Sequence, residues 1–309
     1  MLRRTLGNLA VGVLILGTLL SSGGAQAAPF APGNIVVYRI GDGAAALTSA
    51  ATAAFLDEYT PAGTPVQSIA LPTTAAGANK RLTGSGTATS EGLITRSVDG
   101  QYLLAIGYDA ATGTASVTSS TAAAVNRVVA RVAADGSIDT TTALTDASSG
   151  SNPRSVASID GTAFWTTGGA GGIRYSTYGG TTSTQLSTTL TNIRGTGIAG
   201  GQLFVSSGSG TNRLAAVGSG IPTTAGQTIA ALPGVSVAAS YYQFFFADLD
   251  AGVAGVDTVY IVDDSAVGIQ KYSLVGGTWT LNGSIAVSGA RGLTATVSGN
   301  SVTLFAATQ

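Results

Sequence analysis

The sequence predicts an all-β protein, a β-propeller of about six four-stranded blades, from three observations. After the N-terminus, no stretch shows the periodicity of a long amphipathic helix. Short apolar or alternating runs of five to eight residues recur instead, separated by Gly, Asp, Asn and Ser. A phrase of two strands joined by a glycine turn also repeats, at intervals near the length of a propeller blade.

The first 27 residues have the order of parts found in a secretory signal peptide. Arg3 and Arg4 form a basic start, an apolar run spans residues 9–20, and Ala25-Gln26-Ala27 is a small-x-small cleavage site. The run is shorter than the roughly 20 residues that a membrane-spanning helix needs. We therefore expect a signal peptide over residues 1–27, a single propeller domain over residues 28–309, and a secreted or cell-surface protein without a membrane span.

Seven runs are enriched in the β-branched and aromatic residues that favour strands. They are Asn34–Ile40, Gln101–Gly107, Arg127–Val132, Ala163–Thr167, Gln202–Ser206, Thr258–Val262 and Ser301–Ala306. The best helical candidate, Ala44–Leu56, carries only a weak apolar stripe. Strands and turns are therefore expected throughout the mature chain.

The repeated phrase is a short strand, a turn that carries glycine, and then a more apolar strand. Asp-Gly and similar pairs between alternating runs favour tight hairpins. The turn glycines are Gly100, Gly161, Gly201, Gly255 and Gly299, spaced by 61, 40, 54 and 44 residues. With a second hairpin behind each phrase, this spacing predicts units of four antiparallel strands.

Six such units can be counted. They begin near Asn34, Gly92, Arg154, Arg194, Tyr242 and Arg291. The first and last are incomplete, so either the two termini pair to complete one blade, which would protect its edges, or the chain is C-terminally truncated. Seven blades are the variant count. A β-solenoid is the alternative fold, but its coils would need about half the observed spacing.

Several of these phrases also resemble those of a group of bacterial secreted proteins of unassigned function. The resemblance rests on Asn34–Arg39, Phe55–Pro61, Tyr242–Leu249 and Gly268–Leu274 and extends over the whole mature chain. It implies propeller-like repeats, with no established activity or catalytic residues. The similar proteins run past the equivalent of Gln309, which favours truncation.

The composition excludes several classes of function. The chain has no cysteine, which rules out disulfides, thiolate catalysis and cysteine metal sites. It has no histidine, which removes the usual general base and most zinc, copper or iron sites. The formal net charge is −1, only 9% of residues are charged, and no basic stripe exists, so we expect no nucleic-acid partner.

An acidic segment is the first candidate site. Asp248, Asp250, Asp257, Asp263 and Asp264 lie within 17 residues. Calcium prefers several carboxylate and carbonyl oxygens, so Asp248, Asp250 and Asp257 are candidate calcium ligands at one edge of a blade. The spacing matches no EF-hand. The alternative is that each aspartate caps a turn.

Three arginines are the second candidate site. Arg154, Arg194 and Arg291 each open the first strand of a repeated phrase. The first strands of the blades line the central channel of a propeller, so these side chains are predicted to form a positive ring that binds a carboxylated or phosphorylated ligand. The alternative is that they hold loop carbonyls or a neighbouring aspartate.

The remaining candidates are interpreted as structural. Alternation predicts that Tyr242, Phe244 and Phe246 share one buried face of a strand and that Phe245 takes the other. Trp165 and Trp279 are expected in the core. Asp57 and Glu58 are adjacent on an extended run, face opposite ways and make a poor acid–base pair.

No catalytic set is recognisable, which favours a non-catalytic protein. The sequence thus predicts an extracellular binding or scaffold module whose partner is an unidentified extracellular ligand or a component of the cell envelope. A structural or adhesin-like surface component is one alternative. A calcium-dependent hydrolase that acts on an extracellular polymer is the other.

Overall fold

The computed structural model describes residues 27–264 and 268–308, so the predicted signal peptide lies outside them except for Ala27. Within these residues the chain forms twenty-two strands and one short 3-10 helix, η1 (Val117–Ser119). No helix in this part of the chain is long and apolar enough to cross a lipid bilayer. The all-β class is confirmed.

The N-terminal half forms one eight-stranded antiparallel sheet. Its strands are β1 (Ile35–Ile40), β2 (Ala51–Tyr59), β3 (Pro65–Ala70), β4 (Thr83–Ser85), β5 (Thr95–Arg96), β6 (Tyr102–Tyr108), β7 (Arg127–Ala133) and β8 (Ile138–Leu144). Strand β2 replaces the weak helical candidate. Ala54 and Leu56 alternate onto the face that packs in the hydrophobic core, and β1 and β3 supply the hydrogen-bond partners on either side.

Three four-stranded antiparallel sheets and one hairpin follow, each in chain order. They are β9 (Pro153–Ala157), β10 (Ala163–Gly168), β11 (Arg174–Thr177) and β12 (Thr184–Gln185); β13 (Thr196–Ala199), β14 (Gln202–Ser206), β15 (Leu214–Val217) and β16 (Ile229–Ala231); β17 (Tyr241–Ala247), β18 (Thr258–Asp263), β19 (Gly268–Val275) and β20 (Thr278–Ile285); and β21 (Ala290–Ser298) with β22 (Ser301–Thr308). All seven runs expected from the sequence are strands.

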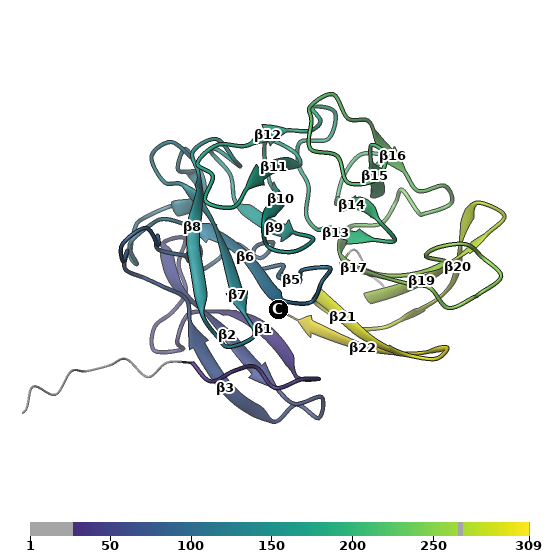
Figure 1. Ribbon diagram of the computed structural model, residues 1–309, viewed down its shortest axis with the longest axis horizontal. Coiled ribbons are helices and arrows are strands. Elements are labelled where there is room, and N and C mark those ends of the chain that lie inside the picture. The colour runs from purple at the N-terminus through teal and green to yellow at the C-terminus, as the bar shows by residue number, and fades with distance from the viewer. Residues whose placement is uncertain (1–26, 265–267, 309) are drawn as a thin grey trace, which may run out of the picture.

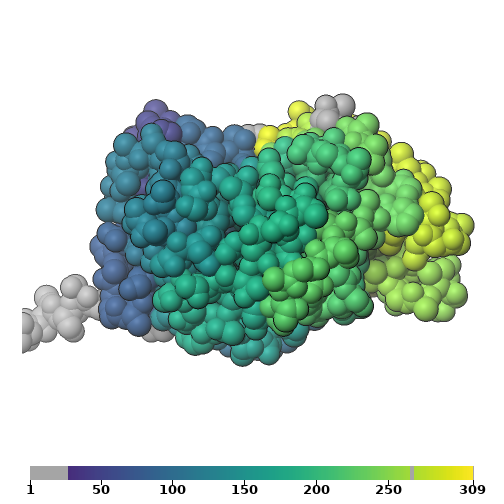
Figure 2. All heavy atoms as spheres, turned by 90° about the horizontal axis from the view of Figure 1, so that it is seen from above, coloured from purple at the N-terminus to yellow at the C-terminus, as the bar shows by residue number. Residues whose placement is uncertain are grey.

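The sheets surround a common centre, toward which β5, β9, β13, β17 and β21 lie (Figure 1). In the space-filling view the surface passes from blue through teal and green to yellow, so successive sheets follow each other in chain order (Figure 2). The core consists of apolar layers between successive sheets. Phe204 of β14, for example, packs with Phe246 of β17 at a ring-centroid distance of 4.4 Å.

The five turn glycines behave as the repeated phrase predicts. Each has a positive φ, between 55° and 79°. Residues with a Cβ are strained in that conformation, so glycine permits the tight reversal between the two strands of each phrase. At Gly161 a Cβ would also lie 2.7 Å from the ring of Tyr102, which ties this turn to the preceding sheet.

One prediction for the aromatic strand is wrong. Phe244 and Phe246 pack in one hydrophobic cluster as expected, but Tyr242 joins Phe245 in the cluster on the other side. The cause is a β-bulge, a register shift between Tyr241 and Phe244 that adds one residue to β17 and reverses the alternation. Tyr242 therefore faces the centre of the molecule. Trp165 and Trp279 are buried, as predicted.

The edges of the terminal strands do not meet in the described residues. There β22 pairs with β21 and β1 pairs with β2, so the pairing of the two termini that would complete one blade is not observed. The outer face of β22 is largely exposed. The number of blades stays a prediction.

Candidate functional site

The three predicted arginines are placed at the centre by irregularities in the strands. Arg154 of β9 lies at a register shift, because Ser155 pairs with Thr167 while Pro153 pairs with Gly168. Arg291 lies at a similar shift in β21, between Ala290 and Gly292. Bulges re-aim side chains and are common beside active sites.

Arg194 reaches the same region from the segment just before β13. Its backbone N–H donates to the carbonyl of Ser206 at 2.8 Å. A Cβ at Gly208 would lie 2.5 Å from its Cζ atom, so the guanidinium rests directly on the backbone there. Only glycine leaves that space open.

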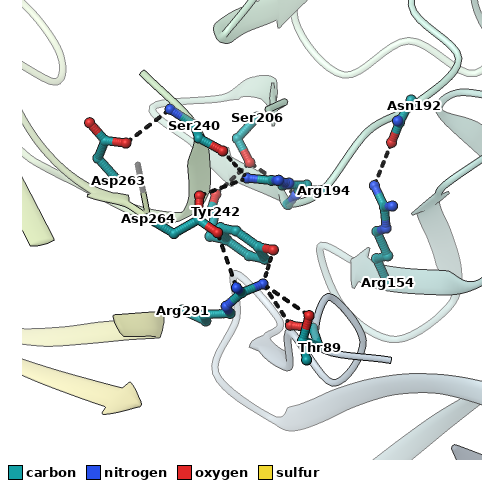
Figure 3. A network of polar contacts seen from close by, with 11 residues as sticks. Thr89, Arg154, Asn192, Arg194, Ser206, Ser240, Tyr242, Asp263, Asp264 and Arg291 are labelled. Atoms are coloured by element: carbon teal, nitrogen blue, oxygen red, sulfur yellow. Dashed lines mark hydrogen bonds and ion pairs between the residues drawn. The ribbon is translucent and has the colours of Figure 1, made fainter. Parts of the chain in front are cut away.

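Arg194 and Arg291 enclose Tyr242 and share one carboxylate (Figure 3). Their Cζ atoms lie 4.0 and 4.2 Å from the centroid of the Tyr242 ring. Each forms an ion pair with Asp264, at 3.4 and 3.1 Å. Arg291 also donates to the Tyr242 hydroxyl and to the carbonyl of Thr89. The side chains of both arginines are 19% exposed, so solvent reaches the cluster.

Arg154 is held differently from the other two arginines. Its Nη1 donates to Asn192 Oδ1 at 2.6 Å and to the carbonyl of Ile193 at 3.2 Å. No described carboxylate forms an ion pair with it, and its Nε has no hydrogen-bond partner among the described residues. Burial, followed by the positive charge of Arg194, lowers the pKa of Arg154 to about 10, so it still carries its charge at neutral pH.

A short loop between β4 and β5 of the first sheet, residues 89–94, contacts residues of this centre and brings Glu91 to it. Thr89 accepts a hydrogen bond from Arg291, and Ser90 accepts one from Asn152. The backbone of Leu93 donates to the carbonyl of Arg154. The carboxyl group between these contacts therefore belongs to the same region as the arginines.

Glu91 is the most perturbed carboxyl of this site. Its Oε1 accepts from the Tyr108 hydroxyl at 2.6 Å and its Oε2 from the Ser85 N–H at 2.9 Å. Burial raises the pKa of Glu91 to about 7. Those two hydrogen bonds and the positive charges of Arg127 and Arg154 act in the opposite direction. The group therefore exchanges its proton near neutral pH, as a general acid or base requires.

The charges at the centre suit an anionic group, and ligand binding by Arg154, Arg194 and Arg291 stays a prediction. Arg194 and Arg291 share Asp264, Arg194 also feels the charge of Asp263, and Arg154 has no ion pair among the described residues. The three arginines therefore leave an excess of positive charge when Glu91 is protonated. Positive charge in a partly buried site attracts phosphate or carboxylate groups. A carboxyl with a pKa near 7 beside such a site is a candidate proton acceptor.

The acidic loop is organised by its own hydrogen bonds. Asp257 Oδ2 accepts from the backbone N–H groups of Leu249 and Asp250, and its Oδ1 accepts from the Thr258 hydroxyl. Asp250 accepts from the N–H of Gly252. Among the described residues no group of three or more carboxylates is arranged to hold a metal ion. Calcium binding at Asp248, Asp250 and Asp257 is therefore an untested prediction of the sequence, and the observed hydrogen bonds favour its alternative, turn capping.

The sequence analysis missed Glu91 and its surroundings. Glu91 lies in a Gly- and Ser-rich loop, and neither Tyr108 nor Arg127 stands near it in the chain. Glu91 is one of only two glutamates, Glu58 being the other. Its distinguishing feature is burial beside charged partners, and that is a property of the fold.

The comparisons with known proteins show the fold. No family model and no curated protein matches the chain. A protein of Bacteroides uniformis, provisionally named 6-phosphogluconolactonase, is similar in structure with a TM-score of 0.50 and 14% identity, over 89% of this chain and 75% of that one. A Bacteroides fragilis protein with the same provisional name has a TM-score of 0.47 and 10% identity, over 83% and 68%.

These neighbours are bacterial proteins of the propeller type, and some solved structures of this kind are of unknown function. They support an all-β, propeller-like fold, whereas the resemblance to bacterial secreted proteins has no match at the level of sequence. The expectation of a non-catalytic binding or scaffold module is contradicted by the Bacteroides uniformis neighbour, which carries the name of a hydrolase. The adhesin-like alternative is contradicted in the same way. The name agrees with the hydrolase class of the other alternative but gives no support to calcium dependence or a polymer substrate.

Proposed function

We propose that this protein is a hydrolase that opens a lactone or a similar ester carrying a negative charge. The observation that carries the proposal is Glu91, a carboxyl with a pKa raised to about 7 at a centre that also holds Arg154, Arg194 and Arg291. The name of the Bacteroides uniformis protein, which denotes hydrolysis of a phosphorylated lactone, supports this reaction class.

In the proposed reaction, Glu91 acts as the general base. Its ionised carboxylate takes a proton from a water molecule while the water oxygen attacks the carbonyl carbon of the lactone. The bond between that carbon and the ring oxygen then breaks. The proton passes from Glu91 to the ring oxygen, and the product is a hydroxy acid. Atoms and charge balance without a further reactant.

The arginines bind the anionic group of the substrate. Arg154 is the best placed, since no described carboxylate forms an ion pair with it. Arg194 and Arg291 add positive charge that Asp264 only partly offsets. Of these three charges, that of Arg154 also favours the ionised form of Glu91, so substrate binding and proton transfer are linked through Arg154.

The test is hydrolysis by the chain from residue 28 onward, followed as proton release. A phosphorylated δ-lactone and an uncharged δ-lactone serve as substrates. We expect the phosphorylated lactone to be hydrolysed faster, and Glu91→Gln to reduce turnover by about 100-fold or more. Arg154→Gln should raise KM for the phosphorylated substrate, and kcat/KM should rise with pH around a midpoint near 7.

Two variants provide controls. Glu58→Gln changes the other glutamate, and Arg174→Gln removes an arginine of β11 that forms an ion pair with Asp146 at 3.0 Å. Both should retain turnover. Absence of hydrolysis by the folded wild-type protein, or full activity of Glu91→Gln, would show that the proposed function is wrong.

We also propose that the sheets are the blades of a six-bladed propeller and that the protein is exported. The eight-stranded sheet would then supply two blades and the hairpin β21–β22 an incomplete one. Mass spectrometry of protein from a producing bacterium tests the export, since cleavage after Ala27 gives a defined mass.

A further inference from the structure

Two fully buried residues lie behind the carboxyl group of Glu91. Tyr108 ends β6 and Arg127 begins β7, and the two are direct partners in the register of these strands. Both are 0% exposed. They are therefore fixed by the sheet itself and cannot touch a ligand at the centre.

Tyr108 connects this buried pair to Glu91. Its hydroxyl donates to Glu91 Oε1 at 2.6 Å. Its ring lies beneath the guanidinium of Arg127, whose Cζ is 4.8 Å from the ring centroid. The three side chains therefore form a row from the interior to the centre of the molecule.

Arg127 is a buried cation held by neutral groups. Its guanidinium donates to the carbonyls of Ser120, Val125, Ser148 and Ser151 and to the Ser120 hydroxyl. Within the described residues it has no ion pair, and its Nε has no hydrogen-bond partner. A buried charge without a paired ion is costly, which suggests a use for this one.

We propose that Tyr108 and Arg127 are positioning residues for Glu91: Tyr108 fixes the direction of the carboxylate, and Arg127 is the buried counter-charge for its ionised form. This inference depends on the proposed function in one respect only: a general base must ionise, which is why Glu91 would need these two residues. The other groups that face Glu91 are Arg154 of β9 and Tyr38 of β1. A Cβ at Gly84 would lie 3.1 Å from the Tyr38 hydroxyl and 3.4 Å from Glu91 Oε2.

The proposal can be tested without any substrate. The chain has only two glutamates, so protein labelled with ¹³C at the glutamate carboxyl carbon gives two NMR signals. Their titrations should separate, because the pKa of Glu91 is raised and that of Glu58 is lowered. Glu91→Gln removes one signal and assigns both.

Tyr108→Phe is the main variant, since it removes only the hydroxyl group. We expect it to raise the titration midpoint of Glu91 by about one pH unit, because the carboxylate loses a donor. Arg127→Gln should raise the midpoint as well, and Arg127→Lys should restore it in part because it keeps the charge. If Arg127→Gln does not fold, Tyr108→Phe decides.

Tyr272→Phe is the matched control. Tyr272 is equally buried, and its hydroxyl donates to Gln270, away from Glu91. Its removal should destabilise the fold but leave the Glu91 midpoint unchanged. A Glu91 midpoint that is unchanged or lower in Tyr108→Phe would overturn the proposal. Shifts in the NMR midpoints of a protein that hydrolyses no lactone would support the positioning roles and overturn only the proposed function.

Discussion

Replacing Glu91 with glutamine should stabilise the protein at alkaline pH and have little effect at acidic pH. The unfolded chain releases the proton of Glu91 near pH 4.5, whereas the folded protein holds it until about pH 7. Between these values the folded state binds more protons, so the free energy of unfolding falls as the pH rises. Each pKa unit corresponds to about 1.4 kcal/mol, which gives a loss of about 3 kcal/mol by pH 8.

Glutamine removes this loss because it has no charge to bury. Its carbonyl oxygen can accept from the Ser85 N–H, and its amide group can donate to the Tyr108 hydroxyl, so both existing contacts keep a partner. The free energy of unfolding of the variant should therefore be about 3 kcal/mol higher than that of the wild type at pH 8 and nearly equal to it at pH 4.

Urea unfolding at a series of pH values measures this difference, and Glu58→Gln provides a control of opposite sign. Burial alone would raise the pKa of Glu58, but hydrogen bonds from Gln67, Asn34 and Ala31 lower it below the usual value. The ionised Glu58 therefore stabilises the folded state at pH values above the pKa that Glu58 has in the unfolded chain. This stabilisation is lost as the pH falls through the pKa that Glu58 has in the folded protein. Glu58→Gln should thus destabilise at neutral pH. If Glu91→Gln lost stability equally at pH 4 and pH 8, the reasoning on Glu91 would be refuted.

Three further results are expected. Gly208→Ala should displace the guanidinium of Arg194 and reduce turnover of a charged lactone. It should also lower the free energy of unfolding by about 1 kcal/mol, because the displaced guanidinium loses its contacts with Ser240 and Asp264. Gly283→Ala, where a Cβ would meet nothing within 4 Å, is the control. Asp264→Asn should lower the free energy of unfolding by about 1–2 kcal/mol, because Arg194 and Arg291 lose their shared carboxylate. Calorimetry should then show that sulfate raises the melting temperature of this variant more than that of the wild type. Removing calcium with a chelator should leave the melting temperature unchanged, because the oxygens of Asp257 are taken by donors of its own loop; a shift of several degrees abolished by Asp257→Asn would instead establish a metal site.

Most of the fold could be predicted from the sequence because it depends on local patterns. Alternating apolar residues determined the strands, and the turn glycines at positions 100, 161, 201, 255 and 299 have the backbone conformation expected of them. The direction of Tyr242 could not be predicted. It depends on one extra residue in β17, and the alternation of apolar residues does not indicate the position of a β-bulge.

The candidate site was predictable only in part. The arginines stood out because they recur at the same place in the repeated phrase. Glu91 did not, since its raised pKa follows from burial beside Tyr108 and Arg127, which come from other strands. The sequence does not show which groups lose their contact with water, so Glu91, a carboxyl whose pKa is raised to about 7, could not be recognised from it.

The loop between β4 and β5 affects how the whole molecule should come apart. In a ring of repeats, each unit usually touches only its neighbours, so local melting can spread from any weak point. Here residues 89–94 of the first sheet are bound to Arg291 of the last hairpin, to Arg154 of the second sheet and, through the carbonyl of Ile94, to Gln243 of β17. This hub joins sheets that are not consecutive in the chain. No single sheet can detach without breaking contacts at the centre, and the ring should therefore lose its structure in one cooperative step.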